Sequence, residues 1–262
     1  MTATLDQILA RTAATLPALR ARRGDLERAV ADAPPRPAFL AELGGRHVAL
    51  IAEVKRRSPS AGVISAELDP VRHASRYAAA GASAISVLTD GPFFGGSLDD
   101  LAAVAAAVDR PLLRKDFILD EAQLLEARAA GASAALLIVR ALAPARLGEL
   151  LRFADQVGLA ALVEIHDGAE LERALATPAR FIGVNSRNLD TFTVDVDAAW
   201  RLIGQIPADR VAVAESGMAT VEDVARAAAA GADAVLIGTA LSSAADPALL
   251  ARDCAQVGRR GR

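Results

Sequence analysis

The chain has 262 residues, which is long enough for one large domain with an extensive buried core. Its formal net charge of −3 excludes a general electrostatic attraction to nucleic acid or to an anionic membrane surface. One cysteine, Cys254, excludes an internal disulfide, and we recognise neither a signal peptide nor a membrane-spanning apolar run, so we expect a cytoplasmic protein. Hydrophobic residues make up 53% of the chain but aromatic residues only 3%, which predicts a core of many small aliphatic contacts.

The first 45 residues are predicted to be largely helical, with a break at the proline-rich residues 34–37. Eight short apolar runs follow, and helix-like segments separate most of them. The runs are residues 48–54, 85–88, 111–114, 135–138, 160–165, 181–184, 211–214 and 235–237. Apolar runs without strict alternation are typical of parallel strands that are buried on both faces.

Helix boundaries support this count of strands. Residues 80–84, 130–134 and 230–234 are three similar segments, and each predicts a helix that ends at a glycine just before a strand. Helix starts are predicted at Asp69, Ser97 and Thr220.

Eight strand–helix units predict the α/β fold class, as a (β/α)8 TIM barrel with an N-terminal helical extension. We assign residues 1–262 to one domain, with the extension at 1–45 and the barrel core at 46–245. An open, doubly wound sheet is the alternative architecture.

The active site of a parallel barrel lies at the carboxyl ends of its strands. Polar residues occur at five of the predicted strand ends, namely Glu53 with Lys55, Lys115, Glu164, Asn185, and Glu215. Glu53 and Lys55 share a face because side chains alternate along a strand, and we place His166 on the face opposite to Glu164. A single polar residue at a strand end is commonly exposed to solvent without a function. Polar residues at five strand ends together favour an active site.

Lys55 and Lys115 are the only two lysines among 29 basic residues, and both lie at this rim. Lysine can lose its proton when it is desolvated, whereas arginine stays charged. The two ammonium groups are therefore candidates for acid–base chemistry, and the survival of two surface lysines by chance is the alternative interpretation.

Glycines follow the seventh and eighth predicted strands, at Gly217 and Gly238. Barrels often bind a phosphate group between these two loops and the start of a short extra helix. A phosphate site is therefore predicted there, although such glycines also occur in ordinary turns.

Several segments resemble the signatures of the indole-3-glycerol phosphate synthase family. They are residues 51–60, 86–89 with 93–97, 113–118, 162–167, 183–189 and 215–217, in the family's order. The resemblance covers roughly residues 35–245. Ala122 and Leu125 replace tyrosines that are usual in the family, Arg140 replaces a small residue, and Thr239 replaces a Glu or Ser.

The resemblance implies a phosphorylated open-chain substrate that carries an anthranilate group, and a ring closure that releases carbon dioxide and water. It implies that Lys115 is the general acid on the carbonyl oxygen and that Glu164 is the acid and base of the dehydration. Glu53 would stabilise developing positive charge, and Asn185 would orient the ring. Lys55 would bind the carboxylate or the phosphate and help as an acid, and the resemblance leaves open which of the two lysines acts at which step.

The remaining implied contacts bind the substrate around these groups. Arg187, Glu215 and Ser216 would lie near the reacting atoms, with Glu215 and Ser216 counted among the catalytic residues. Ser58, Gly217, Gly238 and Thr239 would bind the phosphate. Phe94, Phe117 and Leu88 would form an apolar wall, and core packing is the alternative role for Leu88.

The resemblance implies no cofactor, and the three histidines, His47, His73 and His166, lack the spacing of metal ligands, so no metal is expected. We expect a monomer whose only partner is the phosphorylated small-molecule substrate. The alternatives are phosphoribosylanthranilate isomerase, the tryptophan synthase α subunit, and a non-catalytic barrel that binds a phosphorylated ligand. An isomerase would more naturally offer a Cys/Asp or Asp/Asp pair than two lysines with two glutamates.

Overall fold

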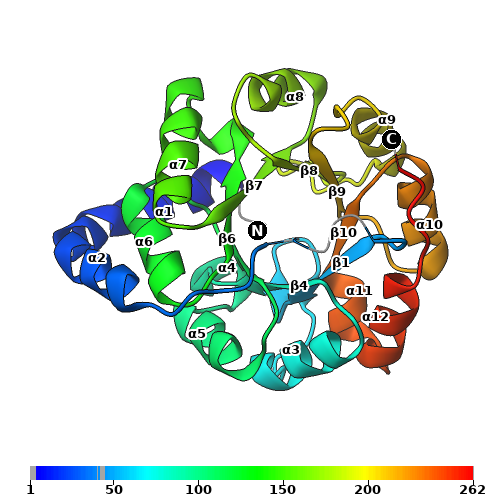
Figure 1. Ribbon diagram of the computed structural model, residues 1–262, viewed down its shortest axis with the longest axis horizontal. Helices are drawn as coiled ribbons and strands as arrows, with labels where there is room; N and C mark the ends of the chain where they lie inside the picture. The colour runs from blue at the N-terminus through cyan, green and yellow to red at the C-terminus, as the bar shows by residue number, and fades with distance from the viewer. Residues whose placement is uncertain (1–3, 40, 42–44, 262) are drawn as a thin grey trace.

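Eight parallel strands form a closed barrel in the structure, a computed structural model that describes residues 4–39, 41 and 45–261. Helices surround the strands on every side (Figure 1). The strands are β1 (Ala49–Val54), β4 (Ala84–Leu88), β5 (Leu112–Lys115), β6 (Ala134–Ile138), β7 (Ala160–Ile165), β8 (Phe181–Asn185), β9 (Val211–Glu215) and β10 (Ala234–Ile237). Strand β1 pairs with both β4 and β10, which closes the sheet and confirms the predicted barrel over the open alternative.

The outer helices begin with polar caps at the predicted positions. The Asp69, Ser97 and Thr220 side chains accept hydrogen bonds from backbone N–H groups in the first turns of α3, α5 and α10. The ring contains α3 (Pro70–Ala79), α5 (Leu98–Ala107), α6 (Glu121–Ala129), α7 (Pro144–Gln156), α8 (Gly168–Leu175), α9 (Val196–Ile203), α10 (Val221–Ala229) and α12 (Pro247–Ala255). Within the described ranges, no helix is long and apolar enough to cross a bilayer.

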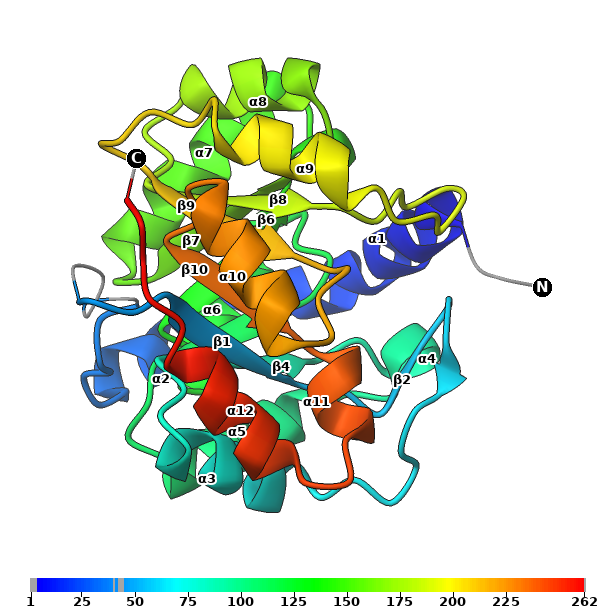
Figure 2. The same ribbon diagram turned by 90° about the vertical axis from the view of Figure 1, so that its right-hand side faces the viewer.

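Short elements lie in the loops that follow the strands. Strands β2 (Arg57–Ser58) and β3 (Gly62–Val63) form a hairpin after β1, and α4 (Gly91–Phe94) contacts β2 (Figure 2). The 3₁₀ helix η1 (Val139–Ala141) follows β6, and α11 (Thr239–Ser243) follows β10.

Two helices, α1 (Leu5–Ala21) and α2 (Arg23–Asp32), precede the barrel; α2 lies outside α6, and α1 also contacts α6 (Figure 1). Arg20 of α1 donates a 2.7 Å hydrogen bond to Asp120, the N-cap residue of α6. Ala122 and Leu125 are buried in a small cluster with Leu26 of α2. The two positions where the resemblance implied tyrosines therefore provide small and aliphatic packing for the N-terminal helices.

Alanines and larger aliphatic side chains together fill the inside of the barrel. Ala49, Ala84, Ala134 and Ala234 lie in the interior cluster together with longer side chains such as Leu113. Alternate residues of the same strands face outward and pack under the helices in a second, larger cluster. The core is thus built mainly from small and branched aliphatic residues, as the composition predicted.

The side chains that face the inside of the barrel change from apolar to polar toward the carboxyl ends of the strands. In β1, Ala49 and Ile51 belong to the interior cluster, and Glu53 is the next residue on that face. In β7, Leu162 is followed on the same face by Glu164. The period of two therefore places polar groups directly above the apolar barrel core.

Candidate active site

A cavity opens above the interior cluster and brings most of the predicted site residues together. Its lining includes Glu53, Lys55, Ser58, Leu88, Phe94, Lys115, Phe117, Glu164, Asn185, Arg187, Glu215 and Ser216. Strands β1, β4, β5, β7, β8 and β9 and the loops that follow them supply these side chains. Residues separated by more than 160 positions in the chain thereby line one space, because the barrel closes.

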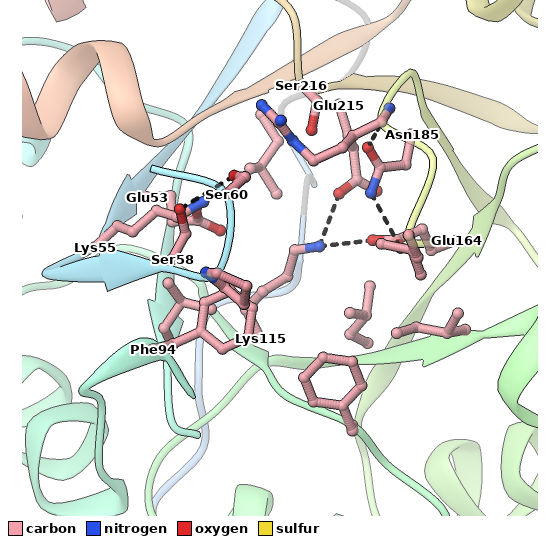
Figure 3. Close-up of a pocket in the computed structure, with 18 of the residues that line it drawn as sticks. Glu53, Lys55, Ser58, Ser60, Phe94, Lys115, Glu164, Asn185, Glu215 and Ser216 are labelled. Atoms are coloured by element: carbon pink, nitrogen blue, oxygen red, sulfur yellow. Dashed lines mark hydrogen bonds and ion pairs between the residues drawn. The ribbon is translucent and has the colours of Figure 1, made fainter. Parts of the chain in front are cut away.

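Lys115 occupies the centre of this cavity and bridges two carboxylates (Figure 3). Its Nζ donates to Glu164 Oε2 at 2.7 Å and to Glu215 Oε2 at 2.9 Å. Burial alone lowers the pKa of Lys115, but the nearby glutamates outweigh this effect and raise the pKa above its ordinary value. The side chain therefore carries its proton as an ammonium group.

The two carboxylates that bind Lys115 have opposite protonation tendencies. Burial raises the pKa of Glu164, but the charges of Lys115 and His166 outweigh it and hold the pKa below its usual range. Burial dominates at Glu215 and raises its pKa to about 7, despite the contact with Lys115. A pair of titratable groups with separated pKa values is the usual basis for acid and base roles within one site.

The Glu215 carboxylate fits in the barrel because residue 183 is a glycine. A Cβ atom at Gly183 would lie 2.0 Å from Glu215 Oε1, much closer than any non-bonded contact. Glycine at this point of β8 therefore leaves the space that the carboxylate occupies while it accepts from Lys115.

Replacing Gly183 by alanine is expected to displace Glu215. We expect a loss of stability of about 1–3 kcal/mol from overpacking and a fall in kcat of about 10- to 100-fold from the misplaced carboxylate. Urea unfolding and steady-state turnover measure the two effects. Gly148→Ala in α7 is the matched control, since its Cβ would lie 3.5 Å from the flexible end of Arg152. A fully active Gly183→Ala variant would contradict the assignment of this space to Glu215.

Glu53 and Lys55 form a second charged pair on the other side of the cavity. Lys55 Nζ lies 3.4 Å from Glu53 Oε1 and 6.0 Å from the centre of the Phe94 ring. Ser86 Oγ donates to Glu53 Oε2 at 3.3 Å. A Cβ atom at Gly238 would lie 2.2 Å from Glu53 Oε1, so this glycine makes room for the Glu53 carboxylate.

Apolar side chains form one wall of the cavity. The Phe94 and Phe117 rings lie 6.0 Å apart between their centroids, with an angle of 40° between their planes. Leu88 lines the same space, and Leu189 and Phe192 contribute from the loop after β8. This wall suits a flat aromatic group, since offset and tilted ring contacts add to the gain from apolar burial.

Arg187 is the cation best placed to bind an anion. Its guanidinium donates to the backbone oxygen of Phe192 at 3.1 Å, and burial lowers its pKa. No carboxylate among the described residues lies within ion-pair distance of Arg187, whereas Lys115 is committed to two. The backbone N–H of Arg187 donates to Asn185 Oδ1 at 3.0 Å. Asn185 Nδ2 in turn donates to Glu164 Oε1 at 3.2 Å.

The residues predicted to bind phosphate are only partly brought together. Ser58 is buried in the cavity lining, and its Oγ accepts a hydrogen bond from the backbone N–H of Ala61. Gly217 follows β9, while Gly238 and Thr239 lie at the start of α11; these three are not part of the cavity lining. A phosphate site that includes them stays a prediction.

The placement of His166 was predicted wrongly. Its Nε2 lies 3.4 Å from Glu164 Oε1, on the same side of β7 rather than on the opposite face. Side chains two positions apart on a strand share a face, so the spacing of 164 and 166 itself contained the correct signal. Ser86, Ser60 and Phe192 were missed. Ser86 lies within the predicted strand 85–88, where a polar residue was the available signal, and Ser60 and Phe192 lie in the loops that follow β1 and β8. No group of three or more His, Cys, Asp or Glu residues in the described part of the chain is arranged to hold a metal ion.

The closed barrel and the acid–base cluster at its carboxyl end define a β/α-barrel enzyme site. Comparison with known proteins specifies the family: residues 5–254 match the family model described as indole-3-glycerol phosphate synthase. An indole-3-glycerol phosphate synthase from a Nocardioides species is 52% identical over 223 residues, which cover 85% of this chain and 86% of the relative. One from Rhodopirellula baltica is 47% identical over 236 residues, which cover 90% and 89%. The chain therefore belongs to the indole-3-glycerol phosphate synthase family.

Solved structures support the fold. A 3-hexulose-6-phosphate synthase superposes with a TM-score of 0.65 and 17% identity, over 80% of this chain and 99% of that chain. Thiamine phosphate pyrophosphorylase from Pyrococcus furiosus gives a TM-score of 0.62 with 14% identity, over 81% and 96%. At such low identity the likeness concerns the barrel alone.

Proposed function

We propose that this chain converts 1-(2-carboxyphenylamino)-1-deoxyribulose 5-phosphate to indole-3-glycerol phosphate, with loss of carbon dioxide and water, in tryptophan biosynthesis. The observation that carries the proposal is the position of Lys115, between two carboxylates of different basicity and beside an aromatic wall. Family membership supports it independently.

The first step is carbon–carbon bond formation at the substrate's carbonyl group. The ring carbon that bears the carboxylate attacks the carbonyl carbon, and the carbonyl oxygen takes a proton from the Lys115 ammonium. The bond from the ring carbon to the carboxylate then breaks, carbon dioxide leaves, and its electron pair restores the aromatic ring. A correctly placed acid typically contributes about 100- to 10,000-fold in rate.

The second step removes water from the cyclised intermediate. The former carbonyl oxygen leaves as water after protonation, while the ring nitrogen donates electron density and becomes positively charged. Loss of a proton from the adjacent carbon then forms the double bond of the indole. Glu164 is the acid and base of this step, and the Glu53 carboxylate stabilises the transient cation.

The remaining polar groups hold the substrate. Arg187 and Lys55 are the cations that bind its carboxylate and phosphate groups, with Ser58 beside them. Asn185 orients the reacting ring, and Phe94 and Phe117 cover its faces. Glu215 and Ser216 lie near the reacting atoms, and Leu88 completes the apolar wall. The expectations of a monomeric, cytoplasmic and cofactor-free protein stay predictions.

The test of this function is turnover of the open-chain substrate, followed by the fluorescence of the indole product. The proposal expects kcat in the common range of about 1–1,000 per second with equal amounts of carbon dioxide and indole. Binding of the substrate without turnover would instead favour a non-catalytic barrel. Turnover of phosphoribosylanthranilate in its place would favour an isomerase.

A further inference from the structure

A row of buried charged groups leads from Glu164 toward the surface. His166 Nε2 lies 3.4 Å from Glu164 Oε1, and His166 Nδ1 lies 3.0 Å from Glu170 Oε2. The side chains of Glu164, His166 and Glu170 are only 2%, 6% and 7% exposed, so bulk solvent has little access to these charges. We call Glu164, His166, Glu170, Arg140 and Asp190 the charge ladder.

The outer end of the ladder is fixed by Arg140 of η1. Arg140 Nε donates to Glu170 Oε1 at 3.0 Å, and its Nη1 donates to Asp190 Oδ2 at 3.2 Å. Glu170 Oε2 also accepts from the backbone N–H of His166 at 2.8 Å. Both oxygens of Glu170 are thereby engaged, which leaves this carboxylate and the ring beside it one favoured orientation. Arg140, which replaces a small residue in the family resemblance, does not line the cavity.

The geometry favours a protonated ring at His166. Nδ1 is hydrogen-bonded to Glu170 Oε2, and Nε2 lies within ion-pair distance of Glu164 Oε1 without a hydrogen bond, so a carboxylate on each side favours a positive charge on the ring. Among the described residues, the charged groups that face the ring are Glu164 of β7 and Glu170 of α8. Arg140 acts on it through Glu170, and Lys115 acts through Glu164. Burial lowers the pKa of His166, but the two carboxylates outweigh it and raise the pKa to about 9.

A second cation beside Glu164 has a specific use during the reaction. Lys115 is the partner of Glu164 at 2.7 Å, but it becomes neutral once it gives its proton to the substrate. Glu164 would then be a buried carboxylate without a counter-charge, which raises its pKa and loosens its orientation. The His166 imidazolium, whose Nδ1 is bound by Glu170, keeps its position and charge when Lys115 loses its proton.

We propose that His166 is a positioning residue that holds the Glu164 carboxylate ionised and oriented for dehydration, with Glu170 and Arg140 as its anchor. This inference rests on the proposed function, because Glu164 must act on the substrate for its orientation to matter. His166 itself transfers no proton in this scheme, and it acts through Glu164 alone.

The first experiment needs no substrate. The chain has three histidines, so a ¹H–¹³C NMR titration of the wild type and of His166→Gln assigns the His166 signal by difference. In Glu170→Gln, which keeps an oxygen to accept from the His166 backbone, the pKa of His166 is expected to fall by about 1 to 3 units. An unchanged titration would overturn the role of Glu170 as anchor.

The second experiment measures kcat and KM between pH 6 and pH 10. His166→Gln removes the positive charge of the ring and is expected to lower kcat by about 10- to 100-fold with little change in KM. In Glu170→Gln the alkaline fall of kcat is expected to move to lower pH, in step with the NMR titration. A role that is only structural would lower stability and leave this pH profile unmoved.

The matched control is Glu121→Gln, which breaks an equally local ion pair on the outer helices. Arg146 Nη2 donates to Glu121 Oε2 at 2.7 Å, and the hydrogen bonds and ion pairs described for these two side chains include no member of the ladder, so His166 titration and the pH profile should not change. Wild-type kcat and profile retained in both His166→Gln and Glu170→Gln would overturn the positioning role and leave the proposed function intact. A wild type without turnover would overturn both, and the same assay separates the two cases.

Discussion

Replacing Lys115 by alanine is expected to lower kcat for ring closure by about 100- to 10,000-fold, with carbon dioxide and indole formation falling together. Lys115 is the ammonium group that lies between Glu164 and Glu215, and no other lysine than Lys55 is available in the chain. Because protonation of the carbonyl precedes every later step, its loss blocks both products equally. Substrate turnover with separate detection of carbon dioxide and indole fluorescence measures this.

The alanine variant also removes the cation from two buried carboxylates, which by itself destabilises the fold. Breaking a buried ion pair in this way typically costs about 3–5 kcal/mol. Lys115→Arg is therefore the informative companion, since it keeps a positive charge between the carboxylates but does not release its proton. We expect Lys115→Arg to unfold near the wild-type urea concentration and still to be nearly inactive. If Lys115→Ala keeps most of its turnover, the acid role belongs to Lys55.

The barrel and its rim were predictable because both follow from short-range periodicity. Eight apolar runs with helix signals between them indicated eight parallel strands, and the structure has them within a few residues of the expected positions. Glu53, Lys115 and Glu164 were recognised as site residues because parallel strands share one carboxyl end. Neither inference required knowledge of which strand lies opposite which.

Contacts across the barrel were not predictable in the same way. Lys115 meets Glu164 and Glu215 only because closure brings β5, β7 and β9 to a common centre at one particular stagger. The clearance that Gly183 gives to Glu215 depends on the same stagger, and the sequence shows only a glycine in a strand. Hairpin β2–β3 was also missed, since its strands have two residues each and no periodicity to detect.

The prediction of the strand face of His166 failed for a different reason, because the sequence spacing contained the correct answer. Strand alternation alone places residues 164 and 166 on one side of β7. What the sequence could not supply is the partner on the far side, since Glu170 lies on α8 and Arg140 on η1. The consequence for chemistry is that the base of the second step has two cationic partners rather than one.

Replacing Glu164 by glutamine is expected to separate the two products in time. Lys115 can still protonate the carbonyl, so ring closure and decarboxylation proceed, while dehydration loses its acid and base and slows by about 100- to 10,000-fold. In a single turnover, carbon dioxide should therefore appear well before indole fluorescence, whereas in Lys115→Ala both are delayed. Rapid-quench sampling of carbon dioxide and stopped-flow fluorescence on the same enzyme preparation measure the interval.

Glu215→Gln is the matched comparison, because Glu215 accepts from the same Lys115 Nζ as Glu164 does. Burial raises the pKa of Glu215 above its usual range, which favours its uncharged form, and glutamine resembles that form. Opposing charges hold the pKa of Glu164 below its usual range, so glutamine there replaces a group that is ionised before the reaction begins. We therefore expect a much smaller loss of kcat in Glu215→Gln. Equal losses in the two variants, or simultaneous release of both products from Glu164→Gln, would assign dehydration to another residue.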